Sequence, residues 1–158
     1  ALQRAEAMLD LYGWKTWPGF FPVTFEVAPD TGQSPVLQTP DFRIFSAPVR
    51  HLIPSMGLRV ECPGGKTLAY SSDTEPCPEV VQLAAGADVL IHEAAGEGKG
   101  HSSAQQAGEI AREAEVGKLV LVHYPTRGGD PRARVQAASE HYAGTVELAR
   151  DFDSIELD

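Results

Sequence analysis

Three short apolar runs alternate with helix-patterned segments in the middle of the chain, and each run leads to polar side chains that can bind a metal ion. In chain order these are Leu68–Tyr70 with Asp73, Val89–Ile91 with His92 and Glu93, and Leu119–Val122 with His123. Open α/β sheets build active sites from buried strands that present polar groups at their carboxyl ends. The pattern therefore predicts a functional site along one edge of a sheet.

The spacing of apolar residues predicts further elements on both sides of this row. Helical spacing predicts helices over Ala1–Tyr12, Pro78–Gly86, Ala104–Ala114 and Arg132–Ala143, the third beginning with a capping box of Ser102 and Gln105. Alternation and short apolar runs predict strands over Val23–Val27, Ser34–Leu37, Phe42–Phe45, Leu58–Glu61, Thr67–Tyr70, Asp88–His92 and Lys118–His123, the first two pairing across a turn at Asp30–Gly32. Val146–Ala149 and Ser154–Leu157 are predicted to close the chain as a hairpin. This mixture predicts an α/β (α+β) fold, with a mixed sheet flanked by helices in one compact unit.

Four aromatic residues, Trp14, Trp17, Phe20 and Phe21, lie close together beside two prolines. They predict an ordered loop packed on apolar surface, because aromatic side chains dominate protein cores. Anchoring to the core is the favoured interpretation, and lining a substrate pocket is the alternative.

Composition narrows the class of protein. A chain of 158 residues that is 42% hydrophobic can bury a real core, as one domain or part of one. The 13 Lys and Arg against 22 Asp and Glu give a net charge of -9, which disfavours a nucleic-acid-binding surface. Cys62 and Cys77 form no CxxC motif, and the sequence has no secretory signal or long apolar run. We therefore expect a reduced, cytoplasmic protein without membrane association.

Histidines and acidic residues at predicted strand ends supply the candidate chemistry. His51, Asp73 and His123 form a plausible ligand set, because zinc-like metals bind neutral imidazole nitrogen and carboxylate oxygen. His141 lies on a polar helix face, where we expect it to be solvated. Ser71 and Ser72 lack a surrounding GxSxG, which disfavours a serine nucleophile.

Glu93 and His101 form a second candidate group. Adjacent side chains of a strand point to opposite faces, so only one of His92 and Glu93 easily faces the site. A carboxylate beside His101 raises the pKa of an imidazole and orients it as a general acid. A surface ion pair near a helix start is an equally weighted alternative.

Five motifs in this order resemble the C-terminal half of the metallo-β-lactamase superfamily, within its ribonuclease Z-like phosphodiesterase branch. They are APVRHLIPSMGLRV around His51, YSSDT around Asp73, HEA at 92–94, HSS at 101–103 and LVLVHYPTR around His123. The ending VELARDFDSIEL also resembles the last hairpin of the family. The resemblance covers most of the chain, from about Phe42 to Arg127.

This resemblance implies an αββα sandwich with two divalent metal ions at one edge, usually zinc, with manganese as an alternative. His51 matches a ligand of one metal, His123 a ligand of the other, and Asp73 the carboxylate that bridges them. In such sites a hydroxide bridging the metals attacks in line. Glu93 and His101 match the pair of the phosphodiesterase branch, in which the histidine protonates the leaving oxygen and the glutamate holds the histidine.

The sequence also departs from the family. The HxHxDH motif, which supplies most of the family's ligands, is absent from these 158 residues. We therefore expect residues 1–158 to be the C-terminal portion of a longer enzyme, inactive alone, with weak or no metal binding. We also expect a homo-oligomer, formed through the sheet face that the missing half leaves open. Ser72, Ala95 and Ser103 replace the commoner Gly, Thr and Thr, and these changes between small residues matter little.

These observations favour a metal-dependent hydrolase of ester bonds, and the Glu93–His101 couple favours a phosphodiester. A small phosphodiester, such as a cyclic nucleotide, is favoured over transfer RNA, because only Glu61–Lys66 stands where transfer-RNA-processing members carry a long arm. A transfer-RNA 3'-end endonuclease and a lactonase are alternatives within the enzyme class. A non-catalytic structural or partner-binding domain is the alternative from another class, supported by the missing HxHxDH.

Overall fold

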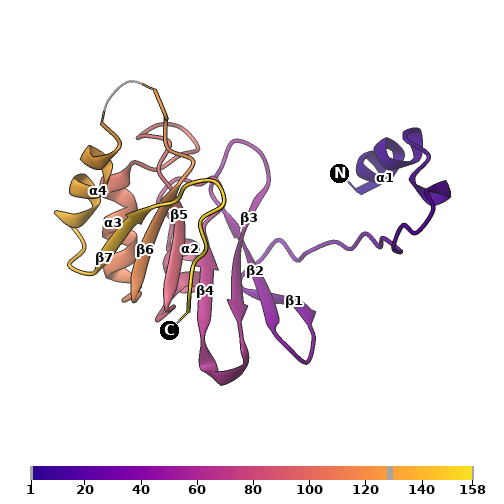
Figure 1. Cartoon of the computed structure of the whole chain (residues 1–158), viewed down its shortest axis with the longest axis horizontal. Helices are drawn as coiled ribbons and strands as arrows, with labels where there is room; N and C mark the ends of the chain where they lie inside the picture. Colours follow the sequence, from indigo (N-terminus) through magenta and orange to yellow (C-terminus); the bar gives the residue numbers. More distant parts are fainter. Residues whose placement is uncertain (1, 128–129, 158) are drawn as a thin grey trace.

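The computed structural model describes residues 2–127 and 130–157, and its centre is a seven-stranded mixed sheet in which strand order follows chain order (Figure 1). The strands are β1 (Ser34–Gln38), β2 (Arg43–Val49), β3 (Ser55–Glu61), β4 (Thr67–Tyr70), β5 (Val89–Glu93), β6 (Lys118–Val122) and β7 (Thr145–Leu148). The helices are α1 (Leu2–Leu11), α2 (Pro78–Ala84), α3 (Ala104–Glu113) and α4 (Arg132–Ser139), with short 3-10 helices at Trp14–Thr16 and Pro63–Gly65. The predicted α/β class is confirmed.

The sheet changes from antiparallel to parallel at β4. Strands β1 to β4 pair as an antiparallel meander, whereas β4 to β7 are parallel and connected through α2, α3 and α4. Such crossovers are right-handed in nearly all proteins, so helices between strands added in one direction cover one face. The contacts agree, because α2 packs on β2, β3 and β4, α3 on β5 and β6, and α4 on α3 and β7.

The main core lies between the helices and this covered face. Ala69, Leu90 and Leu119 occupy one register row across β4, β5 and β6, and none of them is exposed. The next row along the strands faces the other way, and there Tyr70 is 37% exposed and Ile91 is only partly buried. Within the described ranges no helix packs on this second face. One face of the sheet therefore carries the core, while the other remains partly open.

The predicted capping box of α3 is displaced by one residue. Gln106 N donates to Ser103 Oγ at 3.2 Å, and Ser103 N donates to Gln106 Oε1 at 2.8 Å. The prediction of Ser102 and Gln105 was therefore wrong. The two pairs have the same spacing, so the motif alone does not distinguish them. Ser102 is fully buried, and its hydroxyl instead donates to Thr74 O at 2.7 Å.

Two predicted strands do not form. Val23–Val27 has no regular structure, and β1 instead pairs with β2 across a turn in which Thr39 N donates to Phe42 O. Ser154–Leu157 also lies outside the sheet, and β7 pairs in parallel with β6. Alternating polarity is not sufficient for a strand, because its backbone groups also need a neighbouring strand as partner.

The N-terminal segment lies away from the sheet (Figure 1). Helix α1 confirms the prediction for Ala1–Tyr12 over Leu2–Leu11, whereas Tyr12 lies in a turn and Ala1 lies outside the described residues. The aromatic side chains pack on one another, with Trp17 and Phe20 centroids 5.3 Å apart and Phe20 and Phe21 centroids 4.7 Å apart. Trp14 is buried, but Trp17 is 48% exposed and Phe21 is 68% exposed, and none of the four belongs to the main core, so the expectation that they anchor to the core was wrong. None of the helices in the described ranges is both long and apolar enough to span a bilayer.

Candidate metal centre

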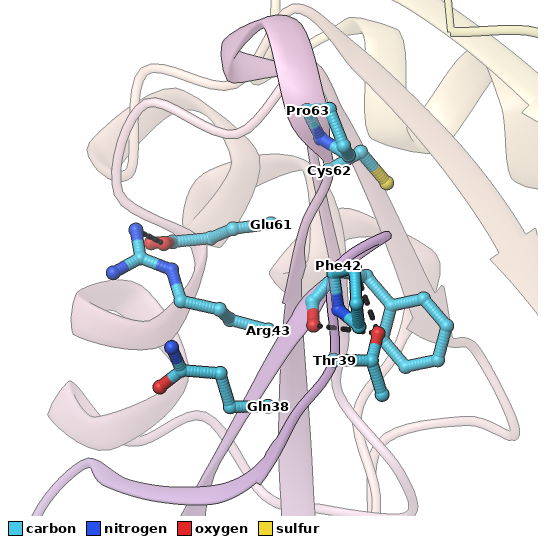
Figure 2. Close-up of a pocket in the computed structure, with 8 residues that line it drawn as sticks. Gln38, Thr39, Phe42, Arg43, Glu61, Cys62 and Pro63 are labelled. Atoms are coloured by element: carbon cyan, nitrogen blue, oxygen red, sulfur yellow. Dashed lines mark hydrogen bonds and ion pairs between the residues drawn. The ribbon is translucent and has the colours of Figure 1, made fainter.

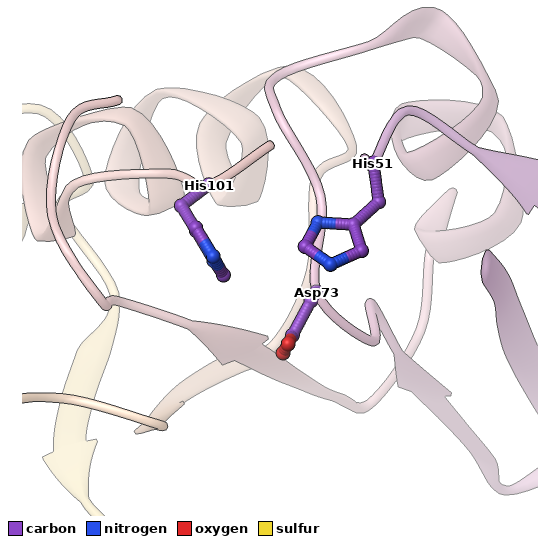
Figure 3. Close-up of side chains that lie close together, drawn as sticks. All are labelled: His51, Asp73 and His101. Carbon is purple, nitrogen blue, oxygen red and sulfur yellow. The ribbon is translucent and has the colours of Figure 1, made fainter. Parts of the chain in front are cut away.

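All five predicted site residues lie at one edge of the sheet. Because β2 and β4 are each antiparallel to β3, the carboxyl ends of β2, β4, β5 and β6 share this edge. His51 follows β2, Asp73 follows β4, Glu93 ends β5, His101 precedes α3 and His123 follows β6. Figure 3 shows His51, Asp73 and His101 pointing toward a common space from three separate segments.

The five side chains form two overlapping groups of possible ligands. In one group His51, Asp73 and His101 each offer a ligand atom within 4.8 Å of the others, and in the second Glu93, His101 and His123 do so. The His101 ring centroid lies 5.0 Å from that of His51 and 5.5 Å from that of His123. His101 therefore lies between the two groups, which the sequence did not predict.

Asp73 and His123 are in direct contact. His123 Nδ1 lies 2.9 Å from Asp73 Oδ1, and the side chains are 51% and 38% exposed respectively. His123 and Ser72 both have a φ of +53°, in the left-handed region that non-glycine residues rarely adopt. Backbone of this kind costs about 1–3 kcal/mol and is concentrated at functional sites. Ser72 follows β4 and directly precedes Asp73, whereas His123 follows β6 and is itself a site residue.

Glu93 is buried and held by several donors. It is 1% exposed, and its carboxylate accepts from the backbone N–H groups of Thr74, Ala95 and Ser102 at 3.1, 2.8 and 3.1 Å. His101 Nδ1 lies 3.0 Å from Glu93 Oε1. Because Glu93 is buried, the pair is not a surface ion pair, and the carboxylate has a fixed position from which it can orient the imidazole.

His92 points to the helix-covered face, so Glu93 is the member of the pair that faces the site. His92 has no exposed surface, and burial lowers the pKa of its imidazole. Its Nδ1 lies 2.7 Å from Glu93 O, so a neutral ring donates there. Among the described residues its Nε2 has no hydrogen-bond partner.

Thr74 connects three of the loops and was missed as a functional residue. It is fully buried, its N–H donates to Glu93, its hydroxyl accepts from Arg50 N at 3.1 Å, and its carbonyl accepts from Ser102. The signal was its place in the YSSDT motif directly after Asp73. Thr74 therefore fixes the loops after β2, β4 and β5 relative to one another.

Of the remaining candidates, His141 lies apart from this centre, whereas Ser71 contacts the backbone of Glu93. His141 is partly exposed and lies 3.4 Å from Glu109 of α3, rather than being fully solvated. Ser71 is fully buried, its hydroxyl donates to Ser72 O and accepts from the Glu93 N–H at 3.1 Å, so it holds backbone beside the site rather than acting as a nucleophile. A pocket of about 320 Å³ lies at the opposite edge of the sheet and is lined by residues that include the free Cys62 and none of the five site residues (Figure 2).

The residues fit a divalent cation of the zinc type. Imidazole nitrogens and carboxylate oxygens are the ligand types of such ions. His51 Nδ1 lies 2.6 Å from Gly100 O, and this kind of hydrogen bond orients histidine ligands in metal sites. A pocket of about 290 Å³ lined by His51, Ser72 and Asp73 borders the centre.

Comparison with known sequences gives the family. The family profile described as "Beta-lactamase superfamily domain" matches residues 17–124. Ribonuclease Z of Myxococcus xanthus (strain DK1622) is 41% identical over 103 residues, which are 59% of this chain and 33% of that protein. Ribonuclease BN of Escherichia coli O1:K1 / APEC is 40% identical over 98 residues, which are 56% of this chain and 32% of that protein. The matched region spans about a third of the length of these curated relatives.

Comparison with solved structures agrees. The metallo-beta-lactamase fold protein YhfI from Bacillus subtilis has a TM-score of 0.68 and 28% identity, covering 74% of this chain and 49% of that one. Human tRNase Z, short form, has a TM-score of 0.62 and 26% identity, covering 80% of this chain and 48% of that one. The chain therefore belongs to the metallo-β-lactamase superfamily, as a ribonuclease Z-like member.

Proposed function

We propose that this chain is part of a metal-dependent hydrolase that cleaves phosphodiester bonds. The observation that carries the proposal is the contact between buried Glu93 and His101, with Oε1 and Nδ1 3.0 Å apart. The His101 side chain belongs to both groups of possible ligands and is 28% exposed, so it can reach a substrate. A leaving alkoxide needs a proton, and an imidazole held by a carboxylate is suited to supply it.

His51, Asp73 and His123 would hold the metal, for which we propose two divalent cations, with zinc as the first choice. When bound, such a pair lowers the pKa of water and stabilises the charge that develops on a phosphoryl group. His101 and Glu93 supply the rest of the chemistry. Glu93 accepts a hydrogen bond from the Nδ1–H of His101. The Nε2 atom of His101 is then the one that holds a proton and delivers it to the leaving oxygen.

RNA is the first substrate we propose, because the relatives with about 40% identity are named ribonuclease Z and ribonuclease BN. These names lean against the small phosphodiester expected from the sequence. The small substrate remains the second candidate because of one structural observation. The connection from β3 to β4 is a short turn with a single 3-10 helix at Pro63–Gly65, and the chain carries a net charge of -9.

We further propose that the 158 residues alone bind metal weakly and hydrolyse little, because they lack HxHxDH. The partly open sheet face with Leu58, Tyr70 and Ile91 supports association of the chain with a second copy. Light scattering tests this association, and a monomer over a wide concentration range would refute it.

The test of function compares the chain with the full product of its gene. Both are assayed with zinc or manganese on a short RNA bearing a 3' extension, on a cyclic nucleotide and on bis-p-nitrophenyl phosphate. In the active form, His101→Ala should lower kcat by about 10²–10⁴ while metal content is unchanged. His141→Ala, a histidine away from the site, is the matched control.

Two results would refute the proposal. One is hydrolysis of a lactone with no action on any phosphodiester. The other is a full-length product that binds no metal and cleaves nothing, which would favour the partner-binding alternative. Loss of bound metal in the His101→Ala variant would instead make His101 a ligand and remove it from the role of acid.

A further inference from the structure

Two hydrogen bonds connect Glu75 to His51 through the backbone of Gly100. The Gly100 N–H donates to Glu75 Oε1 at 2.8 Å, and the Gly100 carbonyl lies 2.6 Å from His51 Nδ1. The two sides of the Gly100 residue are thus occupied by a carboxylate and by the imidazole of a candidate metal ligand.

The second of these bonds determines which nitrogen of His51 carries a proton. A carbonyl oxygen only accepts hydrogen bonds, so His51 Nδ1 must be the donor. In the neutral ring the lone pair is then on Nε2, which is the atom available to a cation. The orientation of one carbonyl therefore selects the tautomer that can bind metal through Nε2.

Gly100 allows this close approach because it lacks a side chain. It is buried with a φ of +85°, and an added Cβ would lie 2.8 Å from His51 Nδ1 and 2.9 Å from Leu52 Cγ. The segment before it, Gly96–Lys99, consists mostly of exposed residues and includes two glycines. Glycine-rich backbone has high conformational freedom, so an anchor at Gly100 is needed to keep its carbonyl on the ring.

Glu75 is itself tied to the residue before His51. Its N–H donates to Arg50 O at 2.7 Å, and its own carbonyl accepts from the Thr74 hydroxyl at 2.7 Å. The contacts form a closed circuit that runs from Arg50 and His51 to Gly100, then to Glu75, and back to Arg50. The backbone and the ring of His51 are therefore held by the same residue.

We propose that Glu75 is a positioning residue, which acts through Gly100 to hold His51 in the Nδ1–H tautomer and present Nε2 to a divalent cation. The use of Nε2 as a ligand rests on the proposed function. The tautomer of His51 and its dependence on Glu75 do not rest on the proposed function.

The test reads the tautomer directly. Protein labelled with ¹⁵N-histidine is studied without metal at about pH 8, above the usual imidazole pKa of about 6.5, by long-range ¹H–¹⁵N correlation. The wild-type should show His51 protonated on Nδ1. Glu75→Ala should give a mixture of tautomers, whereas Glu75→Gln, which keeps an acceptor oxygen, should retain the wild-type pattern.

Metal binding is the second readout, with cadmium(II) alone as the probe. Loss of an outer-shell partner typically costs about 10–100-fold in affinity, so Glu75→Ala should bind at least about tenfold more weakly than wild-type. Glu97→Ala is the matched control, since it removes an equal charge from an exposed position nearby and should change neither readout.

The outcomes separate the two proposals. A His51 protonated on Nε2 in the wild-type, or a tautomer unchanged in Glu75→Ala, overturns the role of Glu75. A tautomer that depends on Glu75, in a full-length gene product that binds no metal, supports that role and counts against the proposed function. If Glu75→Ala does not fold, the test is repeated with Glu75→Asp, whose side chain is one methylene shorter and holds the acceptor farther from the Gly100 N–H. The same mixture of tautomers is expected.

Discussion

Asp73 Oδ1 and His123 Nδ1 lie 2.9 Å apart, although the strands that precede them, β4 and β6, are separated by β5 in the sheet. The contact therefore crosses over the end of β5, where Glu93 is buried. A cation between these side chains would replace their mutual contact with bonds of its own. Asp73 belongs to one group of possible ligands and His123 to the other, so this contact joins the two groups.

Asp73→Asn should weaken metal binding more than any change outside the loops of the site. The amide keeps the shape of the side chain but removes the charge that a divalent cation requires. We expect the dissociation constant for cadmium(II) to rise by more than about tenfold, the size of an outer-shell effect. Asp41→Asn, at an exposed turn, is the control and should bind as wild-type does. Equal affinities for all three proteins would exclude Asp73 as a ligand.

Substitutions at Ser72 should separate backbone strain from hydrogen bonding. Its φ is +53°, and its hydroxyl donates to Met56 O at 2.7 Å. Ser72→Ala loses the bond and keeps the strain, so the free energy of unfolding should fall by about 1 kcal/mol. Ser72→Gly loses the same bond but relieves about 1–2 kcal/mol of left-handed strain, and should be at least as stable as wild-type. Denaturant titration checks the order, and an alanine variant as stable as the glycine variant would contradict it.

The stability of the protein should depend on pH through His92. Burial lowers the pKa of this histidine in the folded state below the ordinary value of 6.5. Below pH 6.5 the unfolded chain gains a proton that the folded protein does not, so this contribution to stability is complete above pH 6.5 and is lost as the pH falls toward the folded-state pKa. The slope is at most about 1.4 kcal/mol per pH unit.

His92→Gln should remove this part of the slope, because glutamine does not titrate. Urea titrations between about pH 7.5 and pH 5, with a chelator present, measure it for both proteins. Parallel curves of unfolding free energy against pH would show that His92 takes up its proton in the folded state.

Gly108→Ala should destabilise the contact between α3 and α4. A Cβ at this position would collide with the backbone of Ala138, and backbone cannot move aside as a flexible side chain can. We expect the collision to lower the free energy of unfolding by about 1–3 kcal/mol. At the upper end of this range the loss exceeds the gain of about 1 kcal/mol that alanine brings in helix propensity. Gly98→Ala, with nothing within 4 Å of the added carbon, should change stability by less than about 0.5 kcal/mol. Thermal unfolding of both variants distinguishes a packing effect from a general effect of replacing glycine.

The edge of the sheet was predictable from the sequence because the information is local. A buried run followed by Asp73 or by His123 places each residue at a strand end without knowledge of the rest of the chain. The sheet neighbours of Val23–Val27 are not local information, and that predicted strand failed because no neighbour pairs with it. The same holds for Ser102 and Gln105, since the motif fits two adjacent starts and only the burial of Ser102 against Thr74 selects between them.

Contacts that position the site were harder to predict for the same reason. Glu75 and Gly100 are ordinary residues in loops, and their relation to His51 exists only after three separate segments of the chain have been brought together. The positions of Glu75 and Gly100 in the sequence do not indicate that either residue orients His51. The sequence thus indicates which side chains do chemistry more readily than it indicates which residues orient them.

The strand order also has a consequence for how the protein is assembled. Because every strand after β1 pairs with the strand before it in the chain, each of these strands finds its neighbour already synthesised as the polypeptide leaves the ribosome. Pairing between strands adjacent in the chain closes shorter loops than pairing between distant strands, and shorter loops cost less chain entropy and form faster. The sheet can therefore grow from β1 toward β7 during synthesis. The group of side chains at its edge is completed only when His123, the residue after β6, emerges, so the proposed metal site would form late in synthesis.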